Sequence, residues 1–297
     1  MFEIDSLIEQ VLLGDIRQVY KTLPDNYIQS IITSPPYFQH RTYADEDHSK
    51  NEIGREKELT EYVNNLTHVF ELIKPKLKED GLLWLNLGDT YRQKELQGVP
   101  WRVAFSLKDS GWRLQSDIIW KKPNAMPSSV KKRPTTDHEY IFLFSKSSDY
   151  YYDSDAIREP HITFSEQSKM KGGRNHFGRR NGTPEKGKNS GNHNLHDGRW
   201  DQAFHPKGRN KRTVWEIPLG KFRDTHFAVY PESLVEICLL ASTRKGDVIF
   251  DPFTGSGTTG VVAKRKERKF IGCELVEKYQ QMAERRINEV IVQPSFF

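Results

Sequence analysis

The chain has 297 residues, with 45 Lys and Arg against 40 Asp and Glu, and this length suffices for one elaborated domain or two small ones. No apolar run approaches the roughly 18 residues needed to span a bilayer. The first fifteen residues carry acidic side chains in place of the basic and apolar pattern of a signal peptide, so membrane and secreted classes of protein are excluded. Cys238 and Cys273 are too few for a disulfide framework or a cysteine-built zinc site, which favours a cytoplasmic location.

Short apolar runs alternate with helical periodicity, which predicts an α/β sheet covered on both faces. In chain order, the expected strands are 10–13, 29–33, 82–87, 114–120, 140–144, 247–250 and 269–273. A helix is expected over 59–73, where apolar residues form one stripe before Pro75. Pro231 opens a second helix, and residues 276–287 form the last one.

The segment 161–212 has a different composition from the rest of the chain. It holds 12 Lys and Arg against four Asp and Glu, together with eight glycines and few aliphatic side chains. Such a segment cannot bury enough apolar area to order itself alone. We interpret it as an insertion whose positive charge meets a polyanion, with nucleic acid the first candidate; a solvated loop is the alternative.

A glycine-rich loop follows the expected strand at 247–250. Gly255, Gly257 and Gly260 have the spacing G-x-G-x-x-G, and Glu274 ends the next strand, where a carboxylate can accept both hydrogen bonds of a ribose diol. The pattern predicts an adenosine-type cofactor; a simple glycine-rich turn is the alternative. Only 37 residues follow Gly260, so the loop comes late in the chain, which disfavours a nicotinamide dehydrogenase.

The second motif is Ser34-Pro35-Pro36-Tyr37, which follows an apolar strand at the edge where α/β folds bind their ligands. The exocyclic amino group of a nucleobase is a poor nucleophile because its lone pair is delocalised. Accepting its two hydrogens, at Ser34 Oγ and at the Pro35 carbonyl, would direct that lone pair at a methyl donor. Tyr37 can stack on a base rotated out of the duplex. A structural proline turn packed by Tyr37 is the alternative.

Together, these motifs resemble the bacterial and phage DNA amino-methyltransferases that use S-adenosylmethionine. Ser34-Pro35-Pro36-Tyr37 matches the family's catalytic motif, and residues 251–257 match its cofactor motif. The resemblance implies a Rossmann-like, mixed seven-stranded sheet with one antiparallel strand and a circularly permuted motif order. It divides the chain into a catalytic half, 1–159, a target-recognition insertion, 160–212, and a cofactor-binding half, 213–297.

The resemblance also assigns roles to single residues. Asp15 would reach the adenine amino group of the cofactor, His226 would precede the segment that flanks its methionine moiety, Phe253 would lie against it, and Glu274 would bind its ribose. The full set of expected cofactor-binding residues is Asp15, His226, Asp251, Phe253, Gly255, Ser256, Gly257, Thr258 and Glu274. No metal is expected, because His193, His196 and His205 are irregularly spaced and lack cysteine partners.

The expected substrate is double-stranded DNA, methylated on an exocyclic amino group. Ser before Pro-Pro is typical of enzymes that act on cytosine N4, so we favour that base; adenine N6 is the alternative, and a DNA-binding protein without turnover is the next. Methylation of cytosine carbon 5 needs a nucleophilic Cys, normally after Pro, and neither cysteine follows one. A companion restriction endonuclease is expected by association with the family.

Two further features have open interpretations. Asp89 ends the strand at 82–87, where it faces the active site or, as we favour, serves as a turn or helix-cap residue. Residues 121–124 and 131–133 form a basic, proline-broken loop that is suited to phosphate contacts or is merely solvated.

Overall fold

The computed structural model describes residues 7–39, 52–160, 207–220 and 230–291. Two compact units make up the chain: Met1–Asp153 with Thr213–Phe297 form the first, and Ser154–Arg212 form the second. No helix in the described residues is long and apolar enough to cross a membrane. All the residues discussed below as a functional site belong to the first unit.

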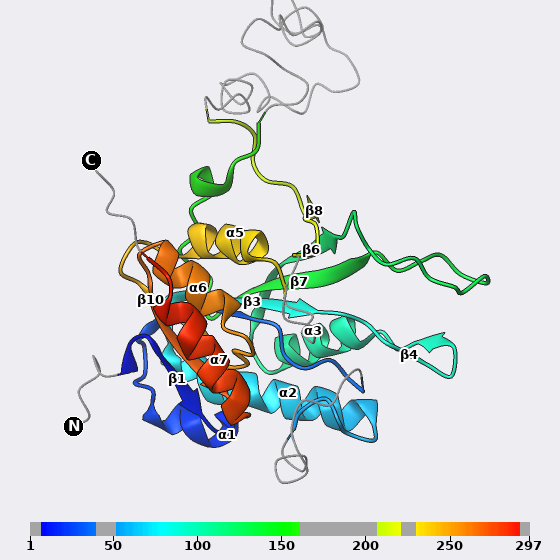
Figure 1. Ribbon diagram of the computed structural model, residues 1–297, viewed down its shortest axis with the longest axis horizontal. Coiled ribbons are helices and arrows are strands. Elements are labelled where there is room, and N and C mark those ends of the chain that lie inside the picture. The colour runs from blue at the N-terminus through cyan, green and yellow to red at the C-terminus, as the bar shows by residue number, and fades with distance from the viewer. Residues whose placement is uncertain (1–6, 40–51, 161–206, 221–229, 292–297) are drawn as a thin grey trace, which may run out of the picture. The chain divides into compact units, whose positions relative to one another are not determined.

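An eight-stranded sheet forms the centre of the first unit, in the order β1-β10-β9-β2-β3-β7-β6-β8 (Figure 1). Its strands are β1 Gln10–Leu13, β2 Ile28–Thr33, β3 Leu77–Leu87, β6 Arg113–Lys121, β7 His138–Ser145, β8 Val214–Glu216, β9 Val248–Asp251 and β10 Lys269–Glu274. Seven of them run parallel, and β7 runs antiparallel to both of its neighbours. A separate hairpin joins β4 Tyr91–Arg92 to β5 Glu95–Leu96.

The predicted fold class and the single antiparallel strand are therefore confirmed, and every expected strand is present. The expected total of seven strands is wrong, because β8 adds an eighth at the edge. Only three residues long, β8 leaves no periodic signal in the sequence. Its middle residue Trp215 is buried against Trp84 of β3, with ring centroids 6.1 Å apart.

Helices cover both faces of the sheet. In the part of the chain that the structure describes, the α-helices are α1 Ile16–Val19, α2 Leu59–Ile73, α3 Val99–Asp109, α5 Glu232–Ser242, α6 Thr258–Arg265 and α7 Glu277–Asn288. The stripe predicted for α2 is buried in the main core with apolar residues of α1, α3 and one face of the sheet. On the other face α5, α6 and α7 pack in succession, and Ser242 of α5 meets Ser30 of β2 at 2.9 Å. Helix α3 was not predicted.

The second unit is described only at its two ends, 154–160 and 207–212. Glu159 and Arg209 exchange backbone hydrogen bonds of 2.9 and 2.8 Å, and the Glu159 carboxylate pairs with Arg209 and Lys211 at 3.1 Å each. The chain thus enters and leaves this unit through two paired segments. Most of the basic insertion expected at 160–212 lies outside the described residues.

Candidate active site

The parallel strands deliver the predicted motifs to one edge of the sheet. Asp15 lies two residues after β1, Ser34 directly follows β2, and Glu274 is the last residue of β10. A cavity of about 430 Å³ lies at this edge and is lined by all three, together with the glycine loop. That volume falls within the range of small-ligand sites, so the two halves of the predicted site form one pocket.

The Ser34–Tyr37 turn is held from behind by its neighbours. The Tyr62 hydroxyl of α2 donates to the Pro36 carbonyl at 2.9 Å, and the Tyr37 ring lies so close to Gly88 that a Cβ there would be 2.5 Å from it. By contrast, no described residue donates to the Pro35 carbonyl. The Pro35 carbonyl, which we expect to accept one hydrogen of the target amino group, can therefore accept from a ligand.

Behind this turn lies a polar cluster, consisting of Ser34, Tyr37, Asn86, Lys122 and Glu139. The Tyr37 hydroxyl donates to Glu139 Oε2 at 2.6 Å, and Asn86 Nδ2 donates to Glu139 Oε2 at 2.9 Å and to Tyr37 Oη at 2.8 Å. Ser34 Oγ lies 3.2 Å from Asn86 Nδ2 and 3.3 Å from Tyr37 Oη. Lys122 forms a short ion pair with Glu139 Oε1. All five residues line the pocket.

The electrostatics of the cluster keep Tyr37 protonated. Burial and the adjacent Glu139 carboxylate raise the pKa of Tyr37 well above its ordinary value, since a buried tyrosinate beside a carboxylate would be poorly solvated and repelled. The Lys122 ammonium also lies 4.6 Å from the centre of the Trp120 ring. Its charge is thus balanced by a carboxylate and an aromatic face.

The glycine loop connects β9 to α6 in a conformation that other residues would resist. Gly255 and Gly257 have φ values of 52° and 83°, in the left-handed region. A Cβ on Gly257 would also lie 2.9 Å from Ala283 of α7. The loop therefore turns sharply and also packs closely against α7. Phe253, Ser256 and Thr258 of this region line the pocket.

Glu274 ties the loop to the end of β10. Its carboxylate accepts the backbone N–H groups of Gly255 at 2.8 Å and Val276 at 3.0 Å, and it is 9% exposed. Burial raises the pKa of Glu274, and these two hydrogen bonds oppose the shift. Each oxygen retains a further lone pair that a hydroxyl of a bound ligand can use.

Asp251 has a different position from the other residues of its motif. It is completely buried and does not line the pocket. Its carboxylate accepts hydrogen bonds from Thr33 at 2.7 Å, Thr259 at 2.6 Å, Tyr230 at 3.1 Å and the Phe253 N–H at 3.1 Å. Asp251 therefore supports the floor of the site by linking β2, β9 and α6.

Asp15 lines the pocket while also beginning α1. Its carboxylate accepts the Arg17 N–H at 2.9 Å and pairs with the Arg17 guanidinium at 2.5 Å. The residue after β1 is thereby fixed at the pocket wall, where the adenine end of a cofactor is expected. His226 lies outside the described residues. Within the described residues, no cluster of His, Cys, Asp or Glu could hold a metal ion.

Donors and walls of this pocket fit an adenosine-type cofactor. A buried hydroxyl, Thr258 Oγ1, has no hydrogen-bond partner among the described residues, and it lines the pocket at the start of α6. Such an atom costs free energy unless a ligand satisfies it. Ile53 and Tyr279 add apolar wall that the sequence motifs did not indicate.

The sequence motifs did not predict some of the residues that line the pocket. Glu139 and Lys122 were not predicted as site residues, since the first lies near the start of a strand and the second in a basic loop. Asp89 accepts the N–H groups of Gly98 and Val99 at the start of α3 at 3.0 Å each, as the favoured interpretation expects, and it also lines the pocket, as the alternative expects.

Comparison with known proteins identifies related chains over nearly the whole length. The family model N6_N4_Mtase, described as DNA methylase, matches residues 28–285. The type II methyltransferase M.Cfr9I of Citrobacter freundii is 36% identical over 303 residues, covering 92% of this chain and 86% of that protein. M.SmaI of Serratia marcescens is 35% identical over 307 residues, covering 94% and 90%.

Solved structures extend the likeness to the fold. The cytosine-N4-specific PvuII DNA methyltransferase superposes with a TM-score of 0.65 at 19% identity, covering 95% of this chain and 93% of that one. M1.HpyAVI in complex with S-adenosylmethionine superposes with a TM-score of 0.56 at 20% identity, covering 94% and 98%. At these low sequence identities, the superpositions show a shared fold and nothing further.

Proposed function

Because the chain belongs to the DNA methylase family of N6 and N4 amino-methyltransferases, whose cofactor is S-adenosylmethionine, we propose that it methylates the N4 amino group of cytosine in DNA. One observation carries the proposal. Ser34 Oγ and the free Pro35 carbonyl line the same pocket as the glycine loop and Glu274. Two acceptors for an amino group thus lie beside a site for the methyl donor.

The two acceptors of the turn would activate the target nitrogen. Ser34 Oγ and the Pro35 carbonyl each accept one amino hydrogen, which pulls the nitrogen toward tetrahedral geometry and frees its lone pair. Tyr37 supplies an aromatic face for the base that has left the duplex. S-adenosylmethionine, when bound, supplies a methyl group on a positively charged sulfur, and Glu274, Phe253 and the glycine loop would hold it.

Ser34 supports cytosine N4 over adenine N6. The motif with Ser before Pro-Pro resembles that of the cytosine N4 enzymes, whereas Asp or Asn is typical of adenine N6 enzymes. A hydroxyl is a weaker acceptor than a carboxylate, so it leaves more of the activation to the second acceptor. Adenine N6 is the second candidate, because the same two acceptors fit either amino group.

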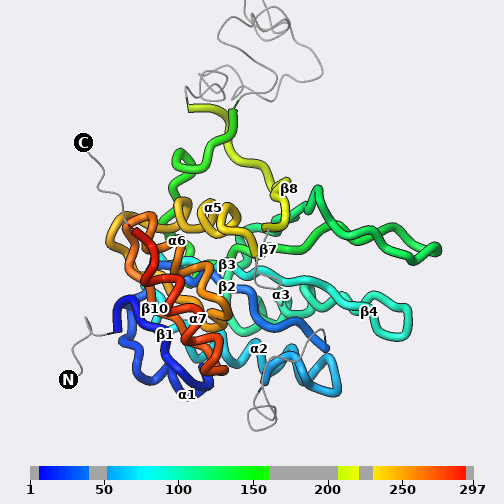
Figure 2. The backbone as a smooth tube through the Cα atoms, in the orientation of Figure 1, coloured from blue at the N-terminus to red at the C-terminus, as the bar shows by residue number. Residues whose placement is uncertain are grey.

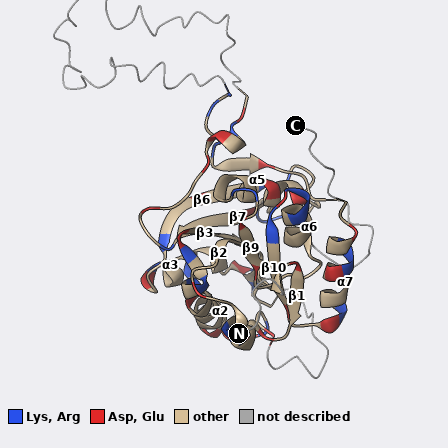
Figure 3. Ribbon diagram, turned by 90° about the vertical axis from the view of Figure 1, so that its left-hand side faces the viewer, with Lys and Arg blue, Asp and Glu red and all other residues tan. Residues whose placement is uncertain are grey.

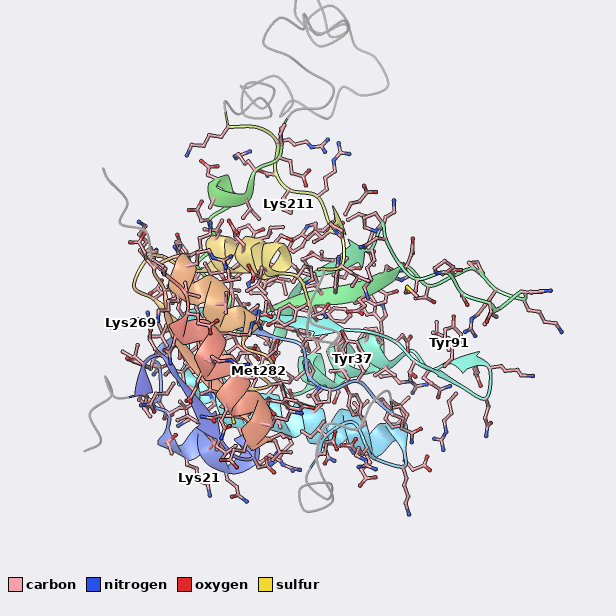
Figure 4. All side chains as sticks on the ribbon, in the orientation of Figure 1. Lys21, Tyr37, Tyr91, Lys211, Lys269 and Met282 are labelled. Atoms are coloured by element: carbon pink, nitrogen blue, oxygen red, sulfur yellow. The ribbon has the colours of Figure 1, made fainter. Side chains whose placement is uncertain are left out.

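DNA would contact the protein beyond the pocket. Residues 122–137 project from the sheet beside the β4–β5 hairpin, and the Arg133 guanidinium lies 3.3 Å from the centre of the Tyr91 ring (Figures 1 and 2). In Figure 4, Tyr37 lies inside the fold while Tyr91 lies out on this hairpin. Lys131 and Lys132 are exposed and form no ion pair with any described residue, so phosphate groups can pair with them.

The opposite outer surface is less suited to a polyanion. Arg265 at the end of α6 pairs with Glu232 at 2.5 Å, and the next residue, Lys266, pairs with Glu236 at 2.6 Å, so the basic residues there alternate with acidic ones (Figure 3). The basic insertion at 160–212 is proposed to select the target sequence. A companion restriction endonuclease is proposed by analogy with the type II relatives.

The test is to digest DNA to nucleosides after incubation with the protein and S-adenosylmethionine, and to identify the methylated base by mass spectrometry. We expect N4-methylcytosine. Ser34→Ala should abolish product while cofactor affinity, measured by calorimetry, stays within about twofold. The matched control is Ser233→Ala on the exposed face of α5, which should retain full turnover. N6-methyladenine would instead establish the second candidate, and full turnover by Ser34→Ala would contradict the assigned role.

A further inference from the structure

Methylation of an amino nitrogen leaves a proton to be removed, and the polar cluster behind Ser34 lies where a group could accept it. When the nitrogen uses its lone pair to bond the methyl carbon, it becomes positively charged and still carries two hydrogens. One must leave before a neutral methylated base is restored. The Ser34 hydroxyl touches this nitrogen in the proposed function, but a neutral hydroxyl cannot retain a second proton at ordinary pH.

Directions of the hydrogen bonds in the cluster are fixed by Glu139. As an ionised carboxylate it can only accept, so the Tyr37 hydroxyl, at 2.6 Å, donates to it. With that proton committed, the 3.3 Å contact between Ser34 and Tyr37 can be made only with Ser34 as donor. One lone pair of Ser34 Oγ faces Asn86 Nδ2 at 3.2 Å, and the other can accept from the target. The path then runs in one direction from the pocket to Glu139.

We propose that Glu139 is the acceptor of the target's proton, which reaches it through the hydroxyls of Ser34 and Tyr37. The inference rests on the proposed function and holds for either target base. The leaving amino proton bonds to Ser34 Oγ, the Ser34 proton moves to Tyr37 Oη, and the Tyr37 proton moves to Glu139 Oε2. The electron pair of the broken N–H bond stays on the nitrogen, which becomes neutral, and Glu139 becomes protonated.

Asn86 and Lys122 prepare this path without taking the proton. Asn86 is an amide and cannot act as a base, but its Nδ2 donates to Tyr37 Oη and Glu139 Oε2 and so holds the two together. The ion pair with Lys122 at Oε1 leaves Oε2 facing Tyr37, so it holds the carboxylate in the orientation that the path requires. The contact between Ser34 and Tyr37 is longer than an ideal hydroxyl hydrogen bond, as is common before substrate binds.

The nearest alternative base is already occupied. Asp89 also lines the pocket, but its oxygens accept three backbone N–H groups, from Thr90, Gly98 and Val99, at 2.8–3.0 Å. These hydrogen bonds occupy its oxygens at the start of α3, and no hydrogen bond between described residues joins Asp89 to Ser34. His138 precedes Glu139 and faces Asp137 at 3.6 Å rather than the hydroxyls of the cluster. Glu139 is therefore the carboxylate connected to Ser34.

The experiment compares Glu139→Gln and Tyr37→Phe with the wild-type enzyme in single-turnover methylation of a duplex, over a range of pH. In the wild type the rate should have a limb that rises with pH, because the acceptor must be free of a proton before it can take one. Both variants should be slower by about 100-fold, in line with the loss of a general base, and both should lose this limb of the pH profile. The matched control is Glu216→Gln, which removes a similar ion pair, with Lys121, outside the pocket and should keep rate and profile.

A second readout separates proton transfer from a structural role. Binding of a duplex with 2-aminopurine at the target, without cofactor, reports both DNA affinity and rotation of the base out of the stack. Both quantities should stay within about threefold of the wild type in Tyr37→Phe, because this variant keeps the aromatic ring and Glu139. Tyr37→Phe therefore tests the relay even if Glu139→Gln fails to fold. A normal rate and acidic limb in Tyr37→Phe, or in folded Glu139→Gln, would overturn the relay alone. A wild-type enzyme that forms no methylated base would overturn the proposed function with it.

Discussion

The close approach of Gly88 to Tyr37 gives a prediction that depends only on packing. A Cβ on Gly88 would lie 2.5 Å from Cε2 and 3.0 Å from Cδ2 of Tyr37, whereas carbon atoms pack at about 3.5–4.0 Å. Gly88 is not among the glycines with positive φ, so Gly88→Ala adds no backbone strain. The ring must move by about 1 Å, which lengthens the 2.6 Å bond from its hydroxyl to Glu139.

The expected cost has two parts. Overpacking costs about 1–3 kcal/mol, and weakening a hydrogen bond to a charged group costs about 1.5–3 kcal/mol, so we expect a loss of about 3 kcal/mol in the free energy of unfolding. Urea denaturation measures it. Gly220→Ala is the matched control, because a Cβ there meets nothing within 4 Å, and it should be nearly neutral.

A double-mutant cycle tests the cause. In a Tyr37→Ala background the space beside residue 88 is empty, so Gly88→Ala should cost less than about 1 kcal/mol, and the coupling between the two sites should be about 2 kcal/mol. An equal cost of Gly88→Ala in both backgrounds would refute the packing argument. So would a neutral effect of the single substitution in the wild-type protein.

Two further predictions concern ligands. Because burial raises the pKa of Glu274 and ribose hydroxyls would donate to its charged form, affinity for S-adenosylmethionine should fall as pH drops through that raised pKa, above the ordinary value of about 4.3. Glu274→Gln should bind more weakly than the wild type above that pKa and lose this dependence in calorimetry; an unchanged profile would contradict the assignment. Lys131→Ala with Lys132→Ala should weaken DNA binding and lower the salt slope by about 2, whereas Lys278→Ala should not; equal slopes would count against residues 122–137 as a DNA contact.

The sequence predicts the strands and the glycine loop because their signals are local. The motif at Ser34 and the loop around Gly257 are each contained in a few neighbouring residues, and apolar alternation indicates the strands beside them. Glu139 leaves no such signal, since a carboxylate at the start of a strand is most often solvated. Its importance depends on the direction of β7. Because β7 is antiparallel, its first residues lie at the edge where the parallel strands end.

The position of Asp251 also could not be predicted from its motif. In the sequence it adjoins the glycine loop, and the resemblance assigned it to the cofactor. In the structure a bond of 2.7 Å from Thr33 places it beneath the pocket, between strands that are more than 200 residues apart in the chain. Burial of a carboxylate requires hydrogen-bond donors around it, and two of these, Thr33 of β2 and Tyr230 before α5, lie outside the motif, so no local pattern indicates them.

The order of the strands explains why the two motifs share one pocket although they lie at opposite ends of the chain. Strands β2 and β9 are neighbours, with Ile31 paired to Phe250. From β2 the chain crosses by α2 to β3 on one side, and from β9 it crosses by α6 to β10 on the other. The two connections leave in opposite directions and cover opposite faces of the sheet, which opens a crevice at the carboxyl ends of β2 and β9. Ser34 and the glycine loop are the residues that immediately follow these two strands. Their juxtaposition therefore follows from the topology, and it would be the same whichever motif came first in the sequence.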